Sequence, residues 1–501
     1  MARQRRRFEY VATESQRIPT PLAFQDSVMN TAHGMAEAGP VFDVGVRDKV
    51  PLKDAILMGF QNVFVMAGIF VFPGIMGHSF NLPAATVAYL YGVTFIGCGL
   101  TTLLIAGLFG RMPLVAGPYA GIFTALLTFG HLPGGDLGAG FGSLCVASLL
   151  WCALSIPIRG FSVVAMLSGL VRNPAIAGVV VMLVMMQIAD LALPHWLGKP
   201  GDATFPGVNF GSGLAAAGVL VCLTVSRVKI ARRLSLLFAL IVGTAVFEFF
   251  HPIDFTKVAT SPWFVMPRLF PFGFSFNLEF CAVFFVILVA INIQTLALMG
   301  VVGQWTGEEM PPSRLSLGVF AMMLGSALAS SIGSFSNLPY PANIAMLRST
   351  RVASRHVTVA AGIILILMGF CTKIDYVFVL LPVPVLSAAA TVLFGIVFVH
   401  AIEMLSGVDW NERRLTATGF SLMVGFGSLF IDPKVLDAMP LTVSLLLRQP
   451  IIVGVATLLL LTLLLPGRER PTAAVAPVDR VPVPDLVPEP DSVPMPVLRH
   501  R

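Results

Sequence analysis

Charged residues are scarce in this chain of 501 residues: they make up 12% of it, against roughly 25% of a typical soluble domain. This low charge excludes a soluble globular enzyme. Hydrophobic residues account for 56% of the chain, enough for about fourteen helices of the roughly 20 apolar residues that cross a bilayer. The sequence therefore predicts a polytopic, all-α membrane protein.

Signals of covalent chemistry and of metal binding are also missing. The six cysteines all fall in or beside apolar runs, without a disulfide or metal-ligand spacing. There is no phosphate-binding Walker loop and no nucleophile elbow. We therefore expect no enzyme activity, no catalytic residue, no metal and no cofactor. The net charge of +6 lies largely in the chain ends and the connections, so it indicates no nucleic-acid partner.

Apolar stretches divide the chain into two similar halves. Seven stretches lie within residues 54–251 and seven more within residues 280–465, between a basic N-terminal segment (1–53) and a Pro-rich tail (466–501). With a cytoplasmic N-terminus, the connections on the cytoplasmic side hold thirteen Lys and Arg, against six on the other side. This excess predicts that the chain crosses the cell (inner) membrane fourteen times, in contact with membrane lipid, with both termini cytoplasmic.

Two of the fourteen stretches are interrupted by Gly or Pro early in their length, and they are the third of each half. They read VAGPYAG (115–121) and NLPYPAN (337–343). Because seven is odd, the second half enters the membrane from the opposite face, which makes an inverted repeat and is typical of transporters. Unpaired backbone groups at membrane depth need protein, water or a ligand as partners. We therefore expect both breaks to face one polar cavity, unless Gly and Pro only kink packed helices here.

Polar side chains at membrane depth extend this predicted site. Tyr119 and Tyr340 follow the prolines of the two breaks and suit ring stacking, and Ala120 follows Tyr119. Amides offer a donor and an acceptor together, which suits a heterocycle with alternating C=O and N–H edges. Each amide could instead join two helices. The amides chosen as site candidates are Gln61, Asn292, Gln294 and Asn343.

The run from Gly325 to Arg355 resembles the signature region of the nucleobase-ascorbate transporter family, also called nucleobase:cation symporter-2. The resemblance extends over roughly residues 54–465. The family has a Gln-His pair in the first span, which Gln61-Asn62 partly matches. Gly117-Pro118 resembles the turn that breaks the family's third span. The chain is thus identified as a divergent member.

Some positions depart from the family pattern. The first position of the tenth-span motif, usually an acidic or amide residue in the substrate site, is Ala342, followed by Asn343, and the motif's Gly is Ala345. Asn292 and Gln294 lie nearest to the family's eighth-span Glu, which contacts the base. An amide cannot titrate. We therefore expect facilitated diffusion, coupling through another group, or a substrate with a different donor and acceptor pattern.

The resemblance implies a secondary transporter for a nucleobase such as uracil or xanthine, working by alternating access. Spans 1–4 and 8–11 would form a core domain and spans 5–7 and 12–14 a gate domain. It also implies a homodimer and a proton or sodium ion as the coupling ion. Two other functions stay open at this point: an anion transporter of the same fold for sulfate, bicarbonate or a carboxylate, and a transport-dead ligand-binding receptor or scaffold.

Overall fold

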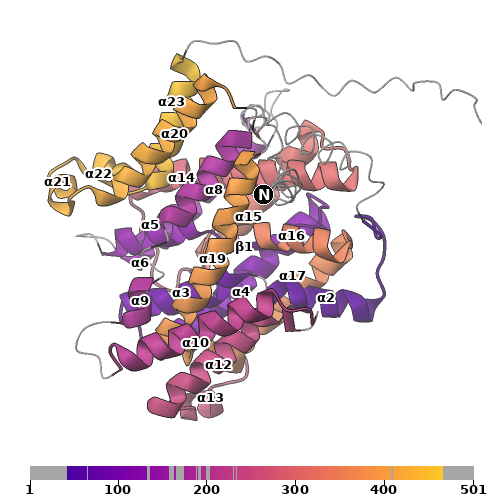
Figure 1. Ribbon diagram of the computed structural model, residues 1–501, viewed down its shortest axis with the longest axis vertical. Helices are drawn as coiled ribbons and strands as arrows, with labels where there is room; N and C mark the ends of the chain where they lie inside the picture. Colours follow the sequence, from indigo (N-terminus) through magenta and orange to yellow (C-terminus); the bar gives the residue numbers. More distant parts are fainter. Residues whose placement is uncertain are drawn as a thin grey trace, which may run out of the picture.

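The computed structural model describes residues 42–465, except for residues 65, 132–135, 157–162, 165–166, 168–173, 188, 190–192, 199–203, 229–230, 233, 407 and 409. The Pro-rich tail and most of the basic N-terminal segment lie outside the described residues. The described chain is mostly helical (Figure 1).

The described elements of the first half are α2 (Leu52–Phe64), α3 (Ala67–Ser79), α4 (Ala84–Thr102) with a π-helical turn (Leu103–Leu108), β1 (Ala116–Pro118), α5 (Ala120–Gly130), α6 (Leu137–Ser155), α8 (Pro174–Gln187), α9 (Leu193–Leu197), α10 (Gly207–Thr224), α12 (Ser235–Phe250) and α13 (Thr256–Thr260). Those of the second half are α14 (Leu278–Thr306), α15 (Pro312–Ser331), β2 (Asn337–Pro339), α16 (Pro341–Thr350), α17 (Arg355–Phe370), α18 (Thr372–Val379), α19 (Val383–Ser406), α20 (Glu412–Gly427) with a 3-10 turn (Ser428–Phe430), α21 (Pro433–Asp437), α22 (Leu441–Leu447) and α23 (Pro450–Leu464).

Six helices in the described part are long and apolar enough to cross a membrane: α4 with its π-helical turn, α6, α10, α14, α15 and α19. Large apolar side chains also stand exposed on the outer helices, for example Phe420 and Met423 on α20 and Leu463 on α23. Such surfaces are unfavourable in water but are what lipid tails contact. The chain is therefore a multi-pass membrane protein.

The helices pack in two groups that each combine both halves of the sequence. In one group, α4 packs against α3, α15 and α17, and α6 packs against α14 and α15. In the other, α19 packs against α8 and α10, and α20 packs against α23. Figure 1 shows α20 to α23 extending away from the rest at one end, and β1 near the middle of the molecule. The breaks thus lie deep inside the helix packing.

Two sequence predictions about the elements need correction. The all-α assignment misses β1 and β2, which form a two-stranded sheet. The broken segments cannot complete helical hydrogen bonds, so their backbones pair with each other instead. The sequence predicts the first of the seven apolar stretches over residues 54–73. The structure has two helices there, α2 and α3, with a change of backbone direction at Met66 (φ −89°, ψ 82°). The hydrophobic pattern of the sequence does not predict this break between α2 and α3, because the residues around it are all apolar.

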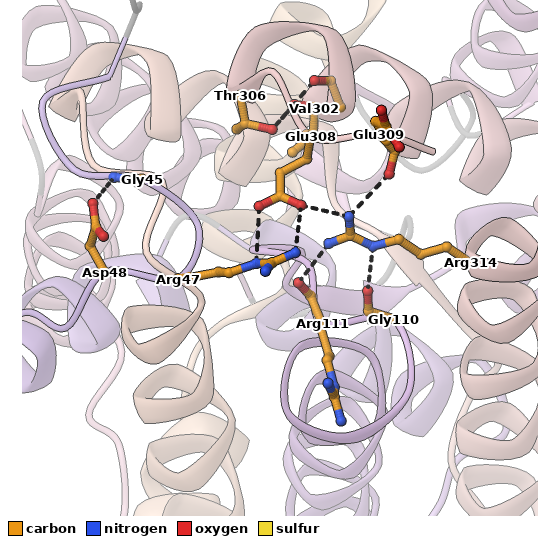
Figure 2. Close-up of polar contacts among 11 residues, drawn as sticks. Gly45, Arg47, Asp48, Gly110, Arg111, Val302, Thr306, Glu308, Glu309 and Arg314 are labelled. Carbon is orange, nitrogen blue, oxygen red and sulfur yellow. Dashed lines mark hydrogen bonds and ion pairs between the residues drawn. The ribbon is translucent and has the colours of Figure 1, made fainter. Parts of the chain in front are cut away.

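An ion-pair cluster ties the N-terminal part of the chain to the connection between α14 and α15 (Figure 2). The Glu308 carboxylate lies 2.7 Å from Nη1 of Arg314 and 3.4 Å from Nε of Arg47. Arg314 also donates to the carbonyl oxygens of Gly110 and Arg111. The hydrogen bond from Arg314 is the main reason that the pKa of Glu308 is lowered from its usual value.

Candidate functional site

The two broken spans meet as antiparallel strands. Ala116 pairs with Pro339, Gly117 with Leu338, and Pro118 with Asn337. Beyond the strands, the N–H of Tyr119 donates to the carbonyl oxygen of Ser336 at 2.9 Å, and the N–H of Tyr340 donates to that of Val115 at 2.9 Å. The segments that the sequence singled out therefore lie side by side, and they satisfy each other's backbone groups in a region where water is scarce.

Buried hydroxyl and amide groups hold the paired strands in place. The hydroxyl of Thr102 accepts the N–H of Ala116 at 3.0 Å, and the hydroxyl of Ser326 accepts that of Asn337 at 3.1 Å. The Asn337 amide donates to the Gly97 carbonyl and to the Thr101 hydroxyl. Because these partners belong to α4 and α15, the strands are fixed to the first packing group and form a rigid floor for a site.

A short helix begins directly after each strand. Tyr119 precedes α5 and Tyr340 precedes α16, both with extended backbone and without a side-chain cap. The first-turn N–H groups of a helix have no intrahelical partner and attract negative charge or a carbonyl oxygen. On α16 the first of these donors is absent, since Pro341 has no N–H. Main-chain donors for a ligand therefore come mainly from α5, beginning at Ala120.

A small cavity lies between these breaks and the second packing group. Its lining residues are Phe72, Pro118, Tyr119, Ala120, Val181, Val184, Met185, Gln294, Leu338, Tyr340 and Phe394. Its volume is about 40 Å³, well below the roughly 300 Å³ at which ligand pockets usually begin. The α8 and α19 residues form the opposite wall. The cavity is therefore contracted, and a ring-sized ligand enters it only if the two groups of helices move apart.

Four of the eight predicted site residues line this cavity: Tyr119, Ala120, Gln294 and Tyr340. Tyr119 is 2% exposed, and its hydroxyl has no hydrogen-bond partner among the described residues. Gln294 is 4% exposed, and its Oε1 is likewise without a partner. A buried polar group left unpaired costs about 1–3 kcal/mol. Both groups are thus available to a polar ligand.

Asn292 lies on the same helix as Gln294 but does not line the cavity. At 3.6 residues per turn, two positions apart means about 200° of rotation, so the two side chains point to opposite sides of α14. Asn292 is fully buried, with both amide atoms unpaired among the described residues. Gln61 on α2 is 6% exposed and also lies away from this lining. Neither residue is placed at the cavity.

Asn343 lies inside α16 and joins that helix to α2. Its Nδ2 donates to the backbone oxygen and to the side-chain oxygen of Asn62, both at 2.8 Å. These bonds give Asn343 the helix-joining role that was the alternative for each amide. Ala342 lies in the first turn of α16, but its side chain lies outside the described residues.

Two aromatic residues of the cavity were not predicted from the sequence. The ring of Phe72 stacks on Phe123 (4.3 Å between centroids, 7° between planes) and lies 6.0 Å from the ring of Phe394. Phe72 comes from α3 and Phe394 from α19, so the two rings lie on opposite walls. Nothing in the sequence distinguishes them, because they are two among 38 phenylalanines in apolar runs.

The cavity lining includes no charged side chain. Across the described residues, no three His, Cys, Asp or Glu side chains lie close enough to hold a metal ion. The site can therefore recognise a ligand by ring contacts, one side-chain amide, a phenol and main-chain donors. These groups fit a small planar, uncharged ligand better than a strongly charged one.

Comparisons with known proteins identify the family. Residues 53–434 match the profile described as "Permease family", Xan_ur_permease. The chain is 29% identical over 440 residues to the nucleobase transporter PlUacP of Paenibacillus larvae, covering 85% of this chain and 98% of that one. It is 26% identical over 450 residues to the xanthine permease XanQ of Escherichia coli K12, covering 85% and 94%.

A solved structure has the same fold at low sequence identity. The murine solute carrier 26 family member A9 anion transporter, in its inward-facing state, superposes with a TM-score of 0.53 at 12% identity, covering 90% of this chain and 74% of that one. Because the family profile spans most of the chain, the protein belongs to this permease family, the nucleobase-ascorbate transporter family that the run from Gly325 to Arg355 resembles.

Proposed function

We propose that the protein is a secondary transporter that carries a nucleobase, such as xanthine, uracil or a related purine or pyrimidine, across the membrane. The observation that carries this proposal is the cavity between the paired breaks and the second packing group, in a chain of the permease family. Its relatives are named as a nucleobase transporter and a xanthine permease, and an uncharged aromatic site with one amide suits the same class of ligand.

Recognition of the base would divide between its faces and its edge. The rings of Tyr119, Tyr340 and Phe72 offer apolar surfaces against which a planar base can stack or lie edge-on. The amide of Gln294 can donate to a ring C=O and accept from the neighbouring N–H. The first N–H groups of α5 supply further donors. Binding would satisfy the unpaired Oε1 of Gln294 and the hydroxyl of Tyr119.

Transport would follow from relative motion of the two packing groups. The group around α4, α14, α15 and α17 would be the core domain, and the group around α8, α19, α20 and α23 the gate domain. We infer that these helices belong to fourteen spans arranged as two inverted repeats of seven. The protein would lie in the inner membrane of the cell, with both termini in the cytoplasm. The cavity wall formed by Val181, Val184 and Phe394 would then open alternately to the two sides. A homodimer stays part of this proposal by family resemblance alone.

An anion as substrate is the less favourable alternative. The anion transporter with this fold is only 12% identical, and that similarity concerns the fold. The cavity offers the N-terminus of α5 to an anion but no cationic side chain. Desolvating a sulfate or bicarbonate without an opposite charge is expensive. We therefore expect these anions to compete poorly with a nucleobase.

Counterflow in proteoliposomes tests the proposal. Vesicles holding the purified protein are loaded with unlabelled xanthine or uracil and diluted into a trace of the same base, radiolabelled. We expect the radiolabelled base to accumulate transiently inside the vesicles, and an excess of sulfate to leave this accumulation unchanged. Protein-free vesicles are the control. Absence of counterflow for every base tested, in vesicles where labelled base still binds, would instead identify a transport-dead receptor.

A further inference from the structure

Asp375 is a buried carboxyl group away from the cavity described above. It lies in α18, an eight-residue helix too short to cross a bilayer, which connects α17 of the proposed core to α19 of the proposed gate. It is 3% exposed, and its Oδ1 has no hydrogen-bond partner among the described residues. No other Asp or Glu of the described chain is buried to this extent.

Asp375 lines a cavity of about 260 Å³. The walls come from α4, from the end of α17, from α18 and from the segment 262–267. That segment is held over the cavity by its backbone: the N–H of Thr372 donates to the carbonyl oxygen of Trp263 at 3.1 Å, and Phe264 forms a bridge with Cys371. Thr372 adds a second buried oxygen without a partner, its Oγ1. The cavity is thus large enough for water and holds two unpaired polar groups.

The carboxyl group lies against helix backbone. A Cβ placed on Gly92 of α4 would meet Oδ2 of Asp375 at 2.7 Å and the carbonyl oxygen of Gly369 of α17 at 2.8 Å. The backbone of Gly92 and Gly369 thus lies beside the carboxyl group, and it carries no positive charge. Burial without an opposite charge disfavours the carboxylate, and it raises the pKa of Asp375 to about 9.

Two cationic residues lie near this region, Lys373 and Arg268. Lys373 on α18 donates to the carbonyl oxygens of Val258 and Ala259, and its Nζ lies over the Trp263 ring. Arg268 meets Tyr89 of α4 through its backbone.

The other titratable groups at this cavity are phenols, Tyr89 on α4 and Tyr376 on α18. The contact of α18 with α3 includes the rings of Phe378 and Phe70, and the side chain of Lys257 on α13 lies outside the described residues. No ion pair to Asp375 occurs in the described part of the chain.

We propose that Asp375 is the proton-binding site through which a proton gradient drives transport. This inference rests on the proposed transport function. Gln294 cannot bind a coupling proton, so transport coupled to protons requires a titrating group elsewhere. Movement of core against gate must displace α18, because it links them. While the Asp375 cavity is open to water on the side of higher proton concentration, the carboxylate takes one proton from a hydronium ion, forming an O–H bond and leaving a water molecule, and the cavity then closes. When the cavity opens to the opposite side, the O–H bond breaks and water on that side accepts the proton.

The test separates exchange from accumulation. Asp375→Asn keeps the shape of the protonated acid but cannot titrate, and Glu248→Gln makes the same change at an exposed carboxylate of α12. We expect Asp375→Asn to keep counterflow at equal pH within about twofold of wild type and to lose the several-fold accumulation driven by an inside-alkaline gradient. Glu248→Gln should keep both. Full gradient-driven accumulation by Asp375→Asn, or wild-type flux indifferent to the gradient, would overturn the inference and leave the transport proposal standing.

A second measurement covers the case in which Asp375→Asn is not recovered as a folded protein. Asp375→Glu retains a titrating group, so it should keep gradient-driven accumulation while moving the pH midpoint of uptake; Glu248→Gln should not move it. An unchanged midpoint in Asp375→Glu would contradict the assignment. Absence of counterflow in the wild-type protein would be a different result, because it would overturn the proposed function itself.

Discussion

Gly117 and Tyr340 lie directly against each other across the two broken spans. A Cβ on Gly117 would lie 2.6 Å from Cδ2 of Tyr340 and 3.3 Å from Sδ of Met66. The ring of Tyr340 therefore occupies the space that any larger residue at position 117 would need. This close approach explains why glycine is required in the first break, and it places the tyrosine of the second break at the cavity.

Substitution Gly117→Ala should weaken substrate binding. The added methyl group displaces the Tyr340 ring, and overpacking of this kind costs about 1–3 kcal/mol, so we expect the Kd for xanthine to rise roughly tenfold. Isothermal titration of the purified protein measures this change. The matched control is Gly218→Ala on α10, where a Cβ meets nothing within 4 Å. Equal affinities for the two variants would show that the Tyr340 position does not matter.

Substitution Gln294→Met should separate binding from stability. It removes an amide whose buried Oε1 is unpaired in the described structure, so the ligand-free protein should melt at the same or a slightly higher temperature. Binding should weaken by about 1 kcal/mol or more per lost hydrogen bond, roughly five- to tenfold. Titration and thermal melting in detergent give the two quantities. Unchanged affinity would remove Gln294 from the site.

Substitution Asn292→Leu, on the same helix, should leave substrate binding unchanged. Both amide atoms of Asn292 are buried without a partner, and the side chain points away from the cavity that Gln294 lines. We expect melting at the same or a higher temperature and a Kd for xanthine within about twofold of wild type. A large loss of affinity would instead mean that the base contacts this other face of α14.

The sequence located the paired breaks but not the whole site. Gly and Pro in matched positions mark residues 115–121 and 337–343, because those residue types interrupt helices whatever their surroundings. Which amide faces the cavity, Asn292 or Gln294, depends on the rotation of α14, and the identity of two neighbouring amides does not determine that rotation. Phe72 and Phe394 become cavity residues only through packing of α3 near α19, which apolar composition does not reveal.

The ion-pair cluster around Glu308 should make the stability of the folded protein depend on pH in the acidic range. Its pKa is lowered in the folded protein, chiefly by the hydrogen bond from Arg314, so the folded state binds a proton less readily than the unfolded chain. The stabilisation is present above the usual Glu pKa and is lost as the pH falls through the lowered value. Melting curves between pH 7 and pH 3 should therefore show a steeper fall for wild type than for Glu308→Gln. Parallel curves would contradict this role.

The most direct test is a structure of the purified protein with xanthine bound. We predict that the base lies between the ring of Tyr119 and that of Tyr340, with its edge hydrogen-bonded to Gln294, and that α8 and α19 have moved outward to enlarge the cavity. A base found elsewhere, for instance beside Arg314, or strands β1 and β2 separated in the complex, would contradict the account.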